Sequence, residues 1–181
     1  RIQRLGGVQY DLDWSWAFES LGLLKQLENR LERWRKLLTR NRLWMERTNV
    51  GNLLATDAVY AGIGGPMLRS CGVNYDLRKV SPYYFYNEVR FDVPLGINGR
   101  VYDRYLVMME EMKQSLSIIQ QLIENIPQGK ILNEDFQVWH YQKDWKLPEG
   151  TYYAFHEAPL GEFGVMIHSD GGNHAERVKF R

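Results

Sequence analysis

The sequence predicts an α+β fold, in which long packed helices carry a small antiparallel β element near the C-terminus. Two segments of the 181 residues, 16–39 and 101–125, repeat apolar residues every three or four positions, the period of an amphipathic helix. Residues from 151 onward show short β-rich runs, with Pro159 and Gly161 marking a turn. We therefore divide the chain into a helical core portion, 1–129, and a β-rich portion of the same domain, 130–181.

The first long helix is predicted over 16–39, with Asn41 near its end. Its apolar stripe consists of Leu21, Leu24, Leu27, Leu31, Trp34 and Leu38. A shorter helix is predicted over 56–62, with Thr56 as its N-cap and Gly62 as its stop.

The second long helix, 101–125, ends before Pro127 and Gly129. Its stripe consists of Tyr105, Met108 or Met109, Met112, Leu116, Ile119 and Leu122. Methionine fills irregular gaps in protein cores, so this stripe favours packing over a cofactor pocket. The two long helices are expected to pack on one another.

A Gly- and Tyr-rich loop, 64–99, joins the long helices and has neither a helical nor a strand period. Backbone outside helices and sheets must be fixed by other hydrogen bonds, so a loop with this many Gly, Pro, Arg and Asp residues is expected to have a structural role. Gly72 stands where the chain leaves one element for the next, and a positive φ is expected there.

In the C-terminal portion, 152–156 and 164–168 are predicted to form a hairpin, with 176–180 as a third strand. His156 and His168 could approach each other across this hairpin. Two histidines without a third ligand make a weak metal site, so structural roles are favoured and no metal is predicted. Residues 133–149 have no clear period and are expected to be irregular.

Composition excludes several classes of function. The formal net charge of +1 gives no reason to expect nucleic acid or an anionic membrane as a partner. A basic stretch at 30–47 is interpreted as a solvated helix face, with Glu28 and Glu32 as partners, rather than as a phosphate-binding surface. The single cysteine, Cys71, excludes an internal disulfide and fits a reducing compartment.

Targeting signals and common catalytic motifs are not found either. No apolar run approaches the roughly 18 residues of a membrane span, and no signal peptide is recognised. Because the chain opens on Arg1 rather than methionine, further residues are expected upstream. Dinucleotide fingerprints, phosphate loops and hydrolase elbows are all unsupported.

The segment 157–162, EAPLGE, is more specific. A carboxylate such as Glu157, placed directly before a Pro-Gly turn, can lie partly buried beside a cavity and influence chemistry there. It can equally accept backbone N–H hydrogen bonds from the turn. The residues alone leave these two interpretations open.

A series of motifs runs along almost the whole chain. GPMLRSCG at 65–72 is followed by DLRK at 76–79, FDVP at 91–94 and YDRY at 102–105, and EAPLGEFG at 157–164 continues the order. This order resembles that of the 49-kDa-type, quinone-site subunit of respiratory complex I, the NADH:ubiquinone oxidoreductase. The motifs FDVP and YDRY are similar to those of its mitochondrial branch. The chain resembles the middle of that family.

The resemblance implies part of a fold like that of the [NiFe]-hydrogenase large subunit, with the nickel site lost. It implies a chain that helps to form a quinone cavity beside the terminal iron–sulfur cluster, which a neighbouring subunit carries. Electrons from NADH reach ubiquinone there, and the reaction is coupled to proton pumping. The implied partners are ubiquinone, the cluster-bearing subunit and any chains that supply the missing N- and C-terminal portions. The implied location is the matrix-side peripheral arm at the mitochondrial inner membrane.

The resemblance also assigns residues. Around the quinone cavity, but without touching the quinone, it implies Glu157, Gly161 and Arg69. For the structural loop it implies Gly65, Gly72, Asp76 and Arg78. The family's quinone-ligating histidine and tyrosine precede the point that corresponds to Arg1, so no catalytic residue is expected in this chain, which alone is expected to be inactive.

Four positions depart from the family pattern: Leu5, Arg100, Met109 and Leu160. The alternative to a working portion of the subunit is a non-catalytic structural remnant within a large mitochondrial assembly. A third possibility is an independent module that binds an anionic partner through the arginine-rich helix.

Overall fold

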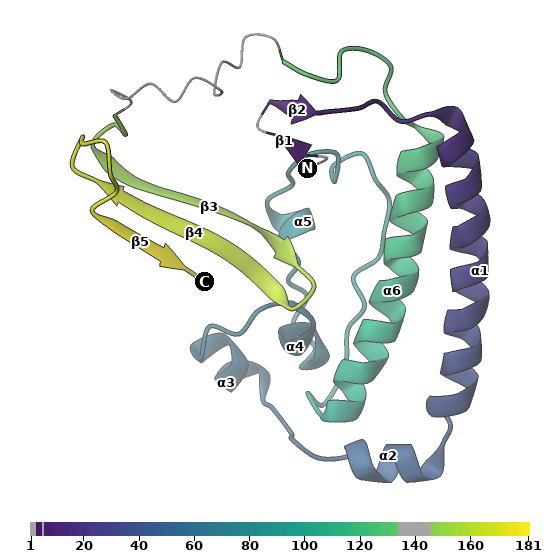
Figure 1. Cartoon of the computed structure of the whole chain (residues 1–181). Coiled ribbons are helices and arrows are strands. Elements are labelled where there is room, and N and C mark those ends of the chain that lie inside the picture. The colour runs from purple at the N-terminus through teal and green to yellow at the C-terminus, as the bar shows by residue number, and fades with distance from the viewer. Residues whose placement is uncertain (1–2, 5, 134–145) are drawn as a thin grey trace.

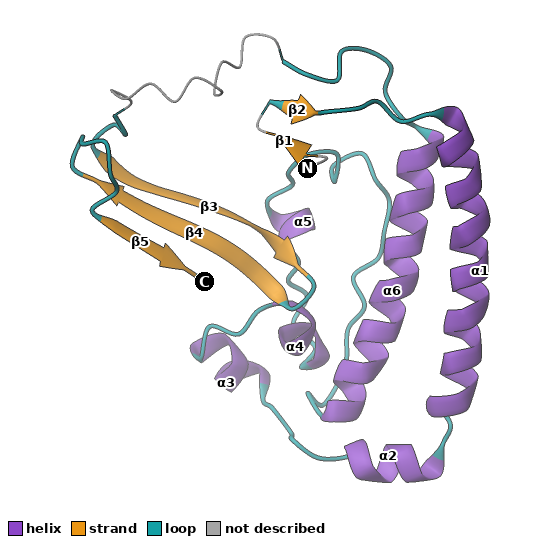
Figure 2. Cartoon of the chain, in the orientation of Figure 1, coloured by secondary structure: helices purple, strands orange, loops and turns teal. Residues whose placement is uncertain are grey.

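The computed structural model describes residues 3–4, 6–133 and 146–181. Helices α1 (Trp14–Leu38) and α6 (Val101–Glu124) run side by side, and a three-stranded sheet lies across from them (Figures 1 and 2). Short helices α4 (Gly65–Ser70) and α5 (Leu77–Val80) lie between the sheet and α6, and α3 (Ala55–Tyr60) packs against α4. The predicted packing of the two long helices is confirmed.

The predicted apolar stripes identify the long helices better than they identify the buried faces. On α1, Leu31 is buried as expected, whereas Trp34 is 47% exposed. On α6 the buried residues are Val107, Met109, Ile118 and Ile123. The predicted stripe residues Met112, Ile119 and Leu122 remain 38–42% exposed. The reason is that α6 packs against both α1 and α4, so its buried surface is rotated away from a single stripe.

One predicted helix end needs correction. Asn41 lies near the end of α1, as predicted, and it also caps α2 (Arg42–Thr48), because its side chain accepts a hydrogen bond from the Trp44 backbone N–H at 3.2 Å. Thr56 is not the N-cap of α3; Leu54 occupies that position without a side-chain hydrogen bond. Gly62 follows the end of α3 with φ +67°, as a stop residue requires.

The loop at 64–99 is more ordered than its sequence pattern indicates, because α4 and α5 both lie within it. Asp76 begins α5 by accepting the Arg78 backbone N–H at 2.9 Å. Leu68 and Cys71 join Ala58 of α3 in a small buried core. Gly72 has φ +87°, so the predicted positive φ is confirmed.

The predicted hairpin and third strand are present, and the hairpin is longer than predicted. Strands β3 (Gly150–Ala158) and β4 (Gly161–Ser169) pair antiparallel around a turn formed by Pro159 and Leu160, and β5 (Arg177–Phe180) pairs with β4. A second, two-stranded ladder joins β1 (Gln3–Arg4) and β2 (Gly7–Val8). The residues at 134–145, including His140, and Leu5 lie outside the described part of the chain.

The two hairpin histidines do not meet. His156 pairs with Phe163 in the strand register, whereas His168 pairs with Thr151 near the other end of the hairpin. His168 instead lies 3.2 Å from a Glu176 carboxylate oxygen. Among the described residues, no group of three His, Cys, Asp or Glu side chains is arranged to hold a metal ion.

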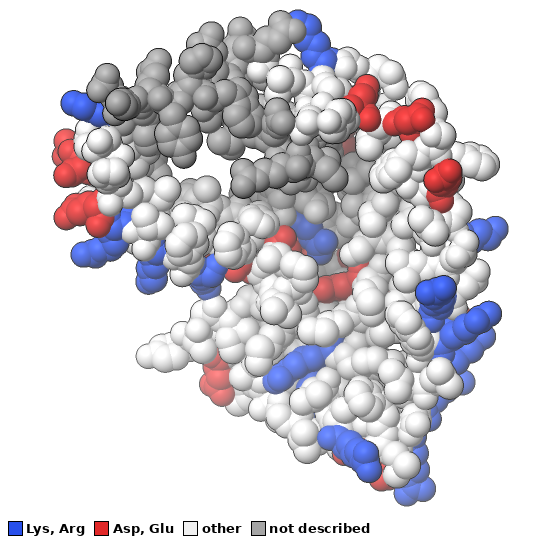
Figure 3. Space-filling view, in the orientation of Figure 1, with Lys and Arg blue, Asp and Glu red and all other residues white. Residues whose placement is uncertain are grey.

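The basic stretch follows α1 and α2. The predicted partner Glu32 pairs with Arg35 at 2.8 Å, and Arg42 pairs with Glu46 of its own helix at 2.8 Å. Lys and Arg side chains gather along the edge of the molecule where α1 lies (Figure 3). Within the described ranges, no helix is both long and apolar enough to cross a membrane.

Candidate functional site

Five charged side chains from four parts of the fold meet between α6 and the sheet. Arg69 comes from α4, Asp76 and Arg78 from the start of α5, Glu111 from α6, and Glu157 from β3 near its turn. We call these five residues the Arg69 cluster. The cluster joins residues up to 88 positions apart in the sequence.

Arg69 is the centre of this cluster, and its side chain is only 1% exposed. Its Nε donates to Glu111 Oε1 at 2.7 Å, and its Nη1 donates to Glu157 Oε1 at 2.9 Å and to the Tyr75 carbonyl at 3.1 Å. Asp76 Oδ2 lies 3.6 Å from the same Nη1. A buried guanidinium needs such acceptors, because an unpaired charge in the interior is strongly destabilising. Arg69 therefore ties α4 to both α6 and β3.

Asp76 and Arg78 form the second pair of the cluster. Arg78 donates from Nε to Asp76 Oδ1 at 2.9 Å and from Nη2 to Oδ2 at 2.6 Å, a two-pronged contact of the kind that guanidinium and carboxylate groups favour. Burial acts to raise the pKa of Asp76, but hydrogen bonds and the charge of Arg78 outweigh it and leave that pKa below its ordinary value. Asp76 is thus held as a carboxylate.

This lowered pKa predicts how acid affects the cluster. The folded form keeps Asp76 ionised at a pH where the unfolded chain binds a proton, so its contribution to stability is complete above the unfolded pKa and is lost as the pH falls through the folded pKa. We expect Asp76→Asn to lower the free energy of unfolding by about 1–3 kcal/mol at neutral pH, because Arg78 loses its charged partner. Limited proteolysis of this chain in its assembled complex should show that the difference in stability between wild type and Asp76→Asn decreases as the pH falls. A difference that stays constant with pH would contradict the lowered pKa of Asp76.

The turn between β3 and β4 lies directly on the beginning of α4. Gly65 has φ +66°, and a Cβ built on it would lie 2.6 Å from the Gly161 nitrogen and closer still to the Gly161 Cα. A Cβ on Gly161 would lie 3.0–3.2 Å from Gly64 and Gly65 backbone atoms. Both positions need glycine, because the two backbones are too close for a side chain between them. This contact brings Glu157, four residues before Gly161, to Arg69.

The contacts of Glu157 in the described part of the chain do not support one of the two interpretations left open by the sequence, a carboxylate that accepts hydrogen bonds from the turn backbone. Its side chain is 6% exposed, and its carboxylate accepts from the Arg69 guanidinium rather than from the turn backbone. Its backbone N–H donates to the Tyr83 hydroxyl at 3.0 Å. Burial raises the pKa of Tyr83, which keeps this hydroxyl protonated. Tyr83 therefore fixes the outer edge of β3 beside the cluster.

Glu111 is the member of the cluster that sequence reasoning did not single out. It lies on an amphipathic helix, where a glutamate next to another glutamate indicates only a solvated face. In the structure it is 17% exposed and hydrogen-bonded to Arg69. Burial raises the pKa of Glu111 above its ordinary value, and the charges of Arg69 and Arg78 only partly oppose the rise. No local pattern indicates this contact, because Arg69 and Glu111 lie 42 positions apart in the sequence.

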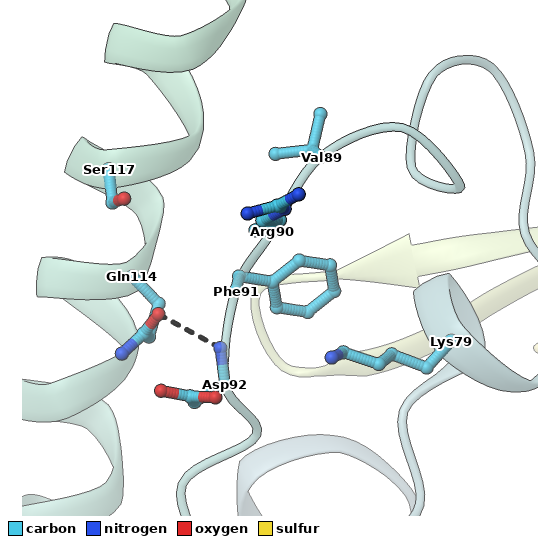
Figure 4. A pocket seen from close by; sticks show the side chains of 7 residues that line it. All are labelled: Lys79, Val89, Arg90, Phe91, Asp92, Gln114 and Ser117. Carbon is cyan, nitrogen blue, oxygen red and sulfur yellow. Dashed lines mark hydrogen bonds between the residues drawn. The ribbon is translucent and has the colours of Figure 1, made fainter.

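A pocket of about 470 Å³ opens between α5 and α6 (Figure 4). It is lined by Lys79, Val89, Arg90, Phe91, Asp92, Gln114 and Ser117. The Asp92 backbone N–H donates to the Gln114 side chain at 3.0 Å and so ties the loop to α6. Phe91 connects this pocket to the cluster, because the Arg78 guanidinium lies 4.8 Å from the Phe91 ring centre.

Comparison with known proteins bears on the whole chain. The family model described as the respiratory-chain NADH dehydrogenase 49 Kd subunit matches residues 1–181. The chain belongs to this 49-kDa subunit family. It is 39% identical over 198 aligned positions to the D-type subunit of NADH-quinone oxidoreductase from Wolbachia sp. subsp. Brugia malayi, covering 98% of this chain and 51% of that protein.

Two further relatives support this assignment. The C/D-type subunit of NADH-quinone oxidoreductase from Bdellovibrio bacteriovorus is 39% identical over 99% of the chain, which covers 36% of that protein. A protein in the structure of the membrane-bound sulfane sulfur reductase, an archaeal respiratory membrane complex, superposes with a TM-score of 0.86 at 33% identity, covering 97% of this chain and 48% of that one. The chain thus spans about half the length of these relatives or less.

The predicted fold is confirmed: helices with a small antiparallel sheet, in the 49-kDa subunit fold that is related to the hydrogenase large subunit. The structure brings Arg69, Asp76, Arg78 and Glu157 into one cluster and places Gly161 against Gly65. Gly72 lies outside this contact, with the Gly96 carbonyl 3.4 Å from where its Cβ would be. The assignment of these residues to a quinone cavity stays a prediction.

Proposed function

We propose that this chain is the central portion of the quinone-site subunit of an NADH:quinone oxidoreductase. In this role it walls the cavity in which quinone is reduced beside the terminal iron–sulfur cluster of a neighbouring subunit. Its support is a family match over all 181 residues, together with a buried charge cluster at the turn that carries the EAPLGEFG motif. The cluster is the observation that carries the proposal, because a site that handles protons and electrons needs fixed charges near it.

The proposed role of this chain is positioning rather than chemistry on the quinone. The bound quinone accepts two electrons and two protons, and the residues that touch it come from outside this chain. Arg69, Glu157 and Gly161 fix the direction of the β3–β4 turn and the field around it. The chain alone is therefore proposed to be inactive, and the other portions and the cluster-bearing subunit are its proposed partners. In the same proposal, the reduction of quinone is coupled to proton pumping by the complex.

The mitochondrial inner membrane, on its matrix side, is the proposed location. Its support is the pair of motifs FDVP and YDRY at 91–94 and 102–105. The Wolbachia and Bdellovibrio relatives named above are bacterial, so they support the family without supporting this branch.

The proposal predicts that Glu157→Gln lowers NADH:quinone turnover of the assembled complex by about tenfold, while oxidation of NADH by an artificial acceptor that takes electrons at the flavin stays normal. Removing one preorganised group that contacts the developing charge typically costs about 100–1,000-fold in rate, and a smaller loss is expected for Glu157 because it is proposed not to touch the quinone. The matched control is Glu162→Gln, which lies opposite Glu157 in the strand register but accepts from Tyr153.

Equal loss of both activities in Glu157→Gln would indicate failed assembly, and no loss in either would place Glu157 in a purely structural turn. Either result contradicts the proposed cavity role. Because the structural neighbour belongs to a sulfane sulfur reductase, activity with a polysulfide in place of quinone is to be measured on the same preparations. Turnover with polysulfide but not quinone would overturn quinone as the acceptor.

A further inference from the structure

The Arg69 cluster contains three carboxylates but only two guanidinium groups. Arg78 is committed to Asp76, because it donates to that carboxylate from its backbone N–H, Nε and Nη2. Arg69 remains for both Glu111 and Glu157, with one nitrogen on each. The surplus negative charge therefore lies on the two glutamates that share Arg69.

A surplus charge at this depth needs compensation. The side chains of Arg69, Asp76 and Glu157 are 1–6% exposed, so bulk water screens them poorly. Two carboxylates that share one cation in such surroundings are expected to bind a proton more readily than either does alone. Of the three carboxylates, Glu111 is the one with 17% of its side chain open to solvent. Glu111 is therefore the carboxylate of the cluster that is most accessible to a proton from water.

We propose that Glu111, together with Glu157, forms a proton-binding site in which one proton is taken up at a Glu111 carboxylate oxygen. In this step water supplies the proton and the carboxylate becomes a carboxylic acid, with no other bond made or broken. The charges of the cluster are then balanced, with two guanidinium groups facing two carboxylates. Release of the proton restores the arrangement in which Arg69 is shared between two carboxylates, Glu111 on α6 and Glu157 on β3.

The charged and titratable groups around Glu111 come from every element packed at this point. Arg69 of α4 and Arg78 of α5 oppose protonation, whereas Asp76 of α5 favours it. Glu157 of β3 shares the Arg69 guanidinium with Glu111. On α6 itself, Glu110 is paired with Lys113 at 3.0 Å. Burial is the main cause of the raised pKa of Glu111, and the charge of Asp76 adds to the rise.

The sign of the effect on stability follows. A carboxyl with a raised folded pKa keeps its proton where the unfolded chain has already lost it. The contribution of Glu111 to stability is therefore complete below its unfolded pKa and is lost as the pH rises through its folded pKa.

The test is infrared difference spectroscopy of the assembled complex between acidic and alkaline pH, which detects the C=O stretch of a protonated carboxyl group. We expect wild type to show such a band disappearing as the pH rises, and Glu111→Gln to lack it. Glu110→Gln is the matched control and should keep it. Glu157→Gln removes the surplus charge, so its band should disappear at a lower pH than in wild type.

Several outcomes would overturn the proposal. A band that survives in Glu111→Gln places the proton elsewhere, and its absence from wild type means that a cation from another chain compensates the charge. An unshifted band in Glu157→Gln shows that the charge of Glu157 does not influence proton binding at Glu111. None of these readouts depends on quinone turnover, so they remain decisive even if the proposed quinone function fails.

The link between this proton and turnover rests on the proposed function. It predicts that Glu111→Gln removes one step from the pH profile of NADH:quinone activity, while the profile with the flavin-level acceptor is unchanged. Loss of the infrared band without any change in the quinone profile would leave the proton site in place and overturn its link to quinone.

Discussion

Replacing Arg69 with methionine is expected to destabilise this chain by about 3–5 kcal/mol, the typical cost of removing one partner from a buried ion pair. The side chain is 1% exposed, and its loss leaves Glu111 and Glu157 without their shared cation. The expected result is little or no assembled complex, measured as the amount of this chain that copurifies with the other subunits.

A matched surface variant separates charge loss from burial. Arg42→Met removes an arginine whose side chain is 91% exposed and which pairs with Glu46 four residues on. Pairs of this kind contribute only about 0.3–0.5 kcal/mol, so assembly should be nearly normal. If Arg69→Met assembled as well as Arg42→Met, the cluster would not be a structural tie between α4, α6 and β3.

A compensated variant separates the effect of the Arg69 charge from the effect of its packing. Removing a buried charge network as a whole costs much less than breaking it, because no uncompensated charge is left behind. The triple variant Arg69→Met, Glu111→Gln, Glu157→Gln should therefore assemble better than Arg69→Met alone. A triple variant that assembles worse would show that the packing of Arg69, rather than its charge, holds the site.

The sequence was sufficient for those elements that are long enough to show a period. Helices α1 and α6 span 25 and 24 residues, and β3 and β4 span nine each, so their patterns predicted them within a few residues at each end. Helices α4 and α5 have six and four residues, too few for a helical period to appear. Helix α4 is held by the contacts of Arg69 with α6 and β3, which join distant parts of the sequence. Helix α5 begins at the Asp76 cap, which is a contact of a single residue.

The candidate site was predictable only in part for the same reason. Arg69, Asp76, Arg78 and Glu157 stand in unusual local motifs, and the resemblance directed attention to each. Glu111 stands in an ordinary helix, and its contact with Arg69 spans 42 positions. The hairpin histidines show the opposite error. The predicted turn at Pro159 is present, and the register that it sets pairs His156 with Phe163 and His168 with Thr151, so the two histidines lie near opposite ends of the hairpin.

The second large effect is expected at the contact between α4 and the β3–β4 turn. Gly65→Ala should prevent this contact, because its Cβ would overlap the Gly161 backbone and its φ of +66° disfavours any residue with a side chain. The left-handed conformation alone costs about 1–2 kcal/mol. The overlap adds about 1–3 kcal/mol, and more if the turn cannot shift. Glu157 would then be separated from Arg69.

A series of glycine-to-alanine variants distinguishes backbone strain from overlap. At Gly22, on the exposed surface of α1, no atom outside the helix lies within 4 Å of the new Cβ, so Gly22→Ala should be neutral or stabilising by up to about 1 kcal/mol. Gly72→Ala has the strain of φ +87°, but its nearest neighbour would be at an ordinary 3.4 Å. We expect assembly to decrease in the order Gly22→Ala, Gly72→Ala, Gly65→Ala. Equal losses of assembled complex in Gly72→Ala and Gly65→Ala would mean that backbone strain alone matters and that the β3–β4 turn does not rest on α4. The close contact of Gly65 with Gly161 would then no longer explain why Glu157 lies beside Arg69.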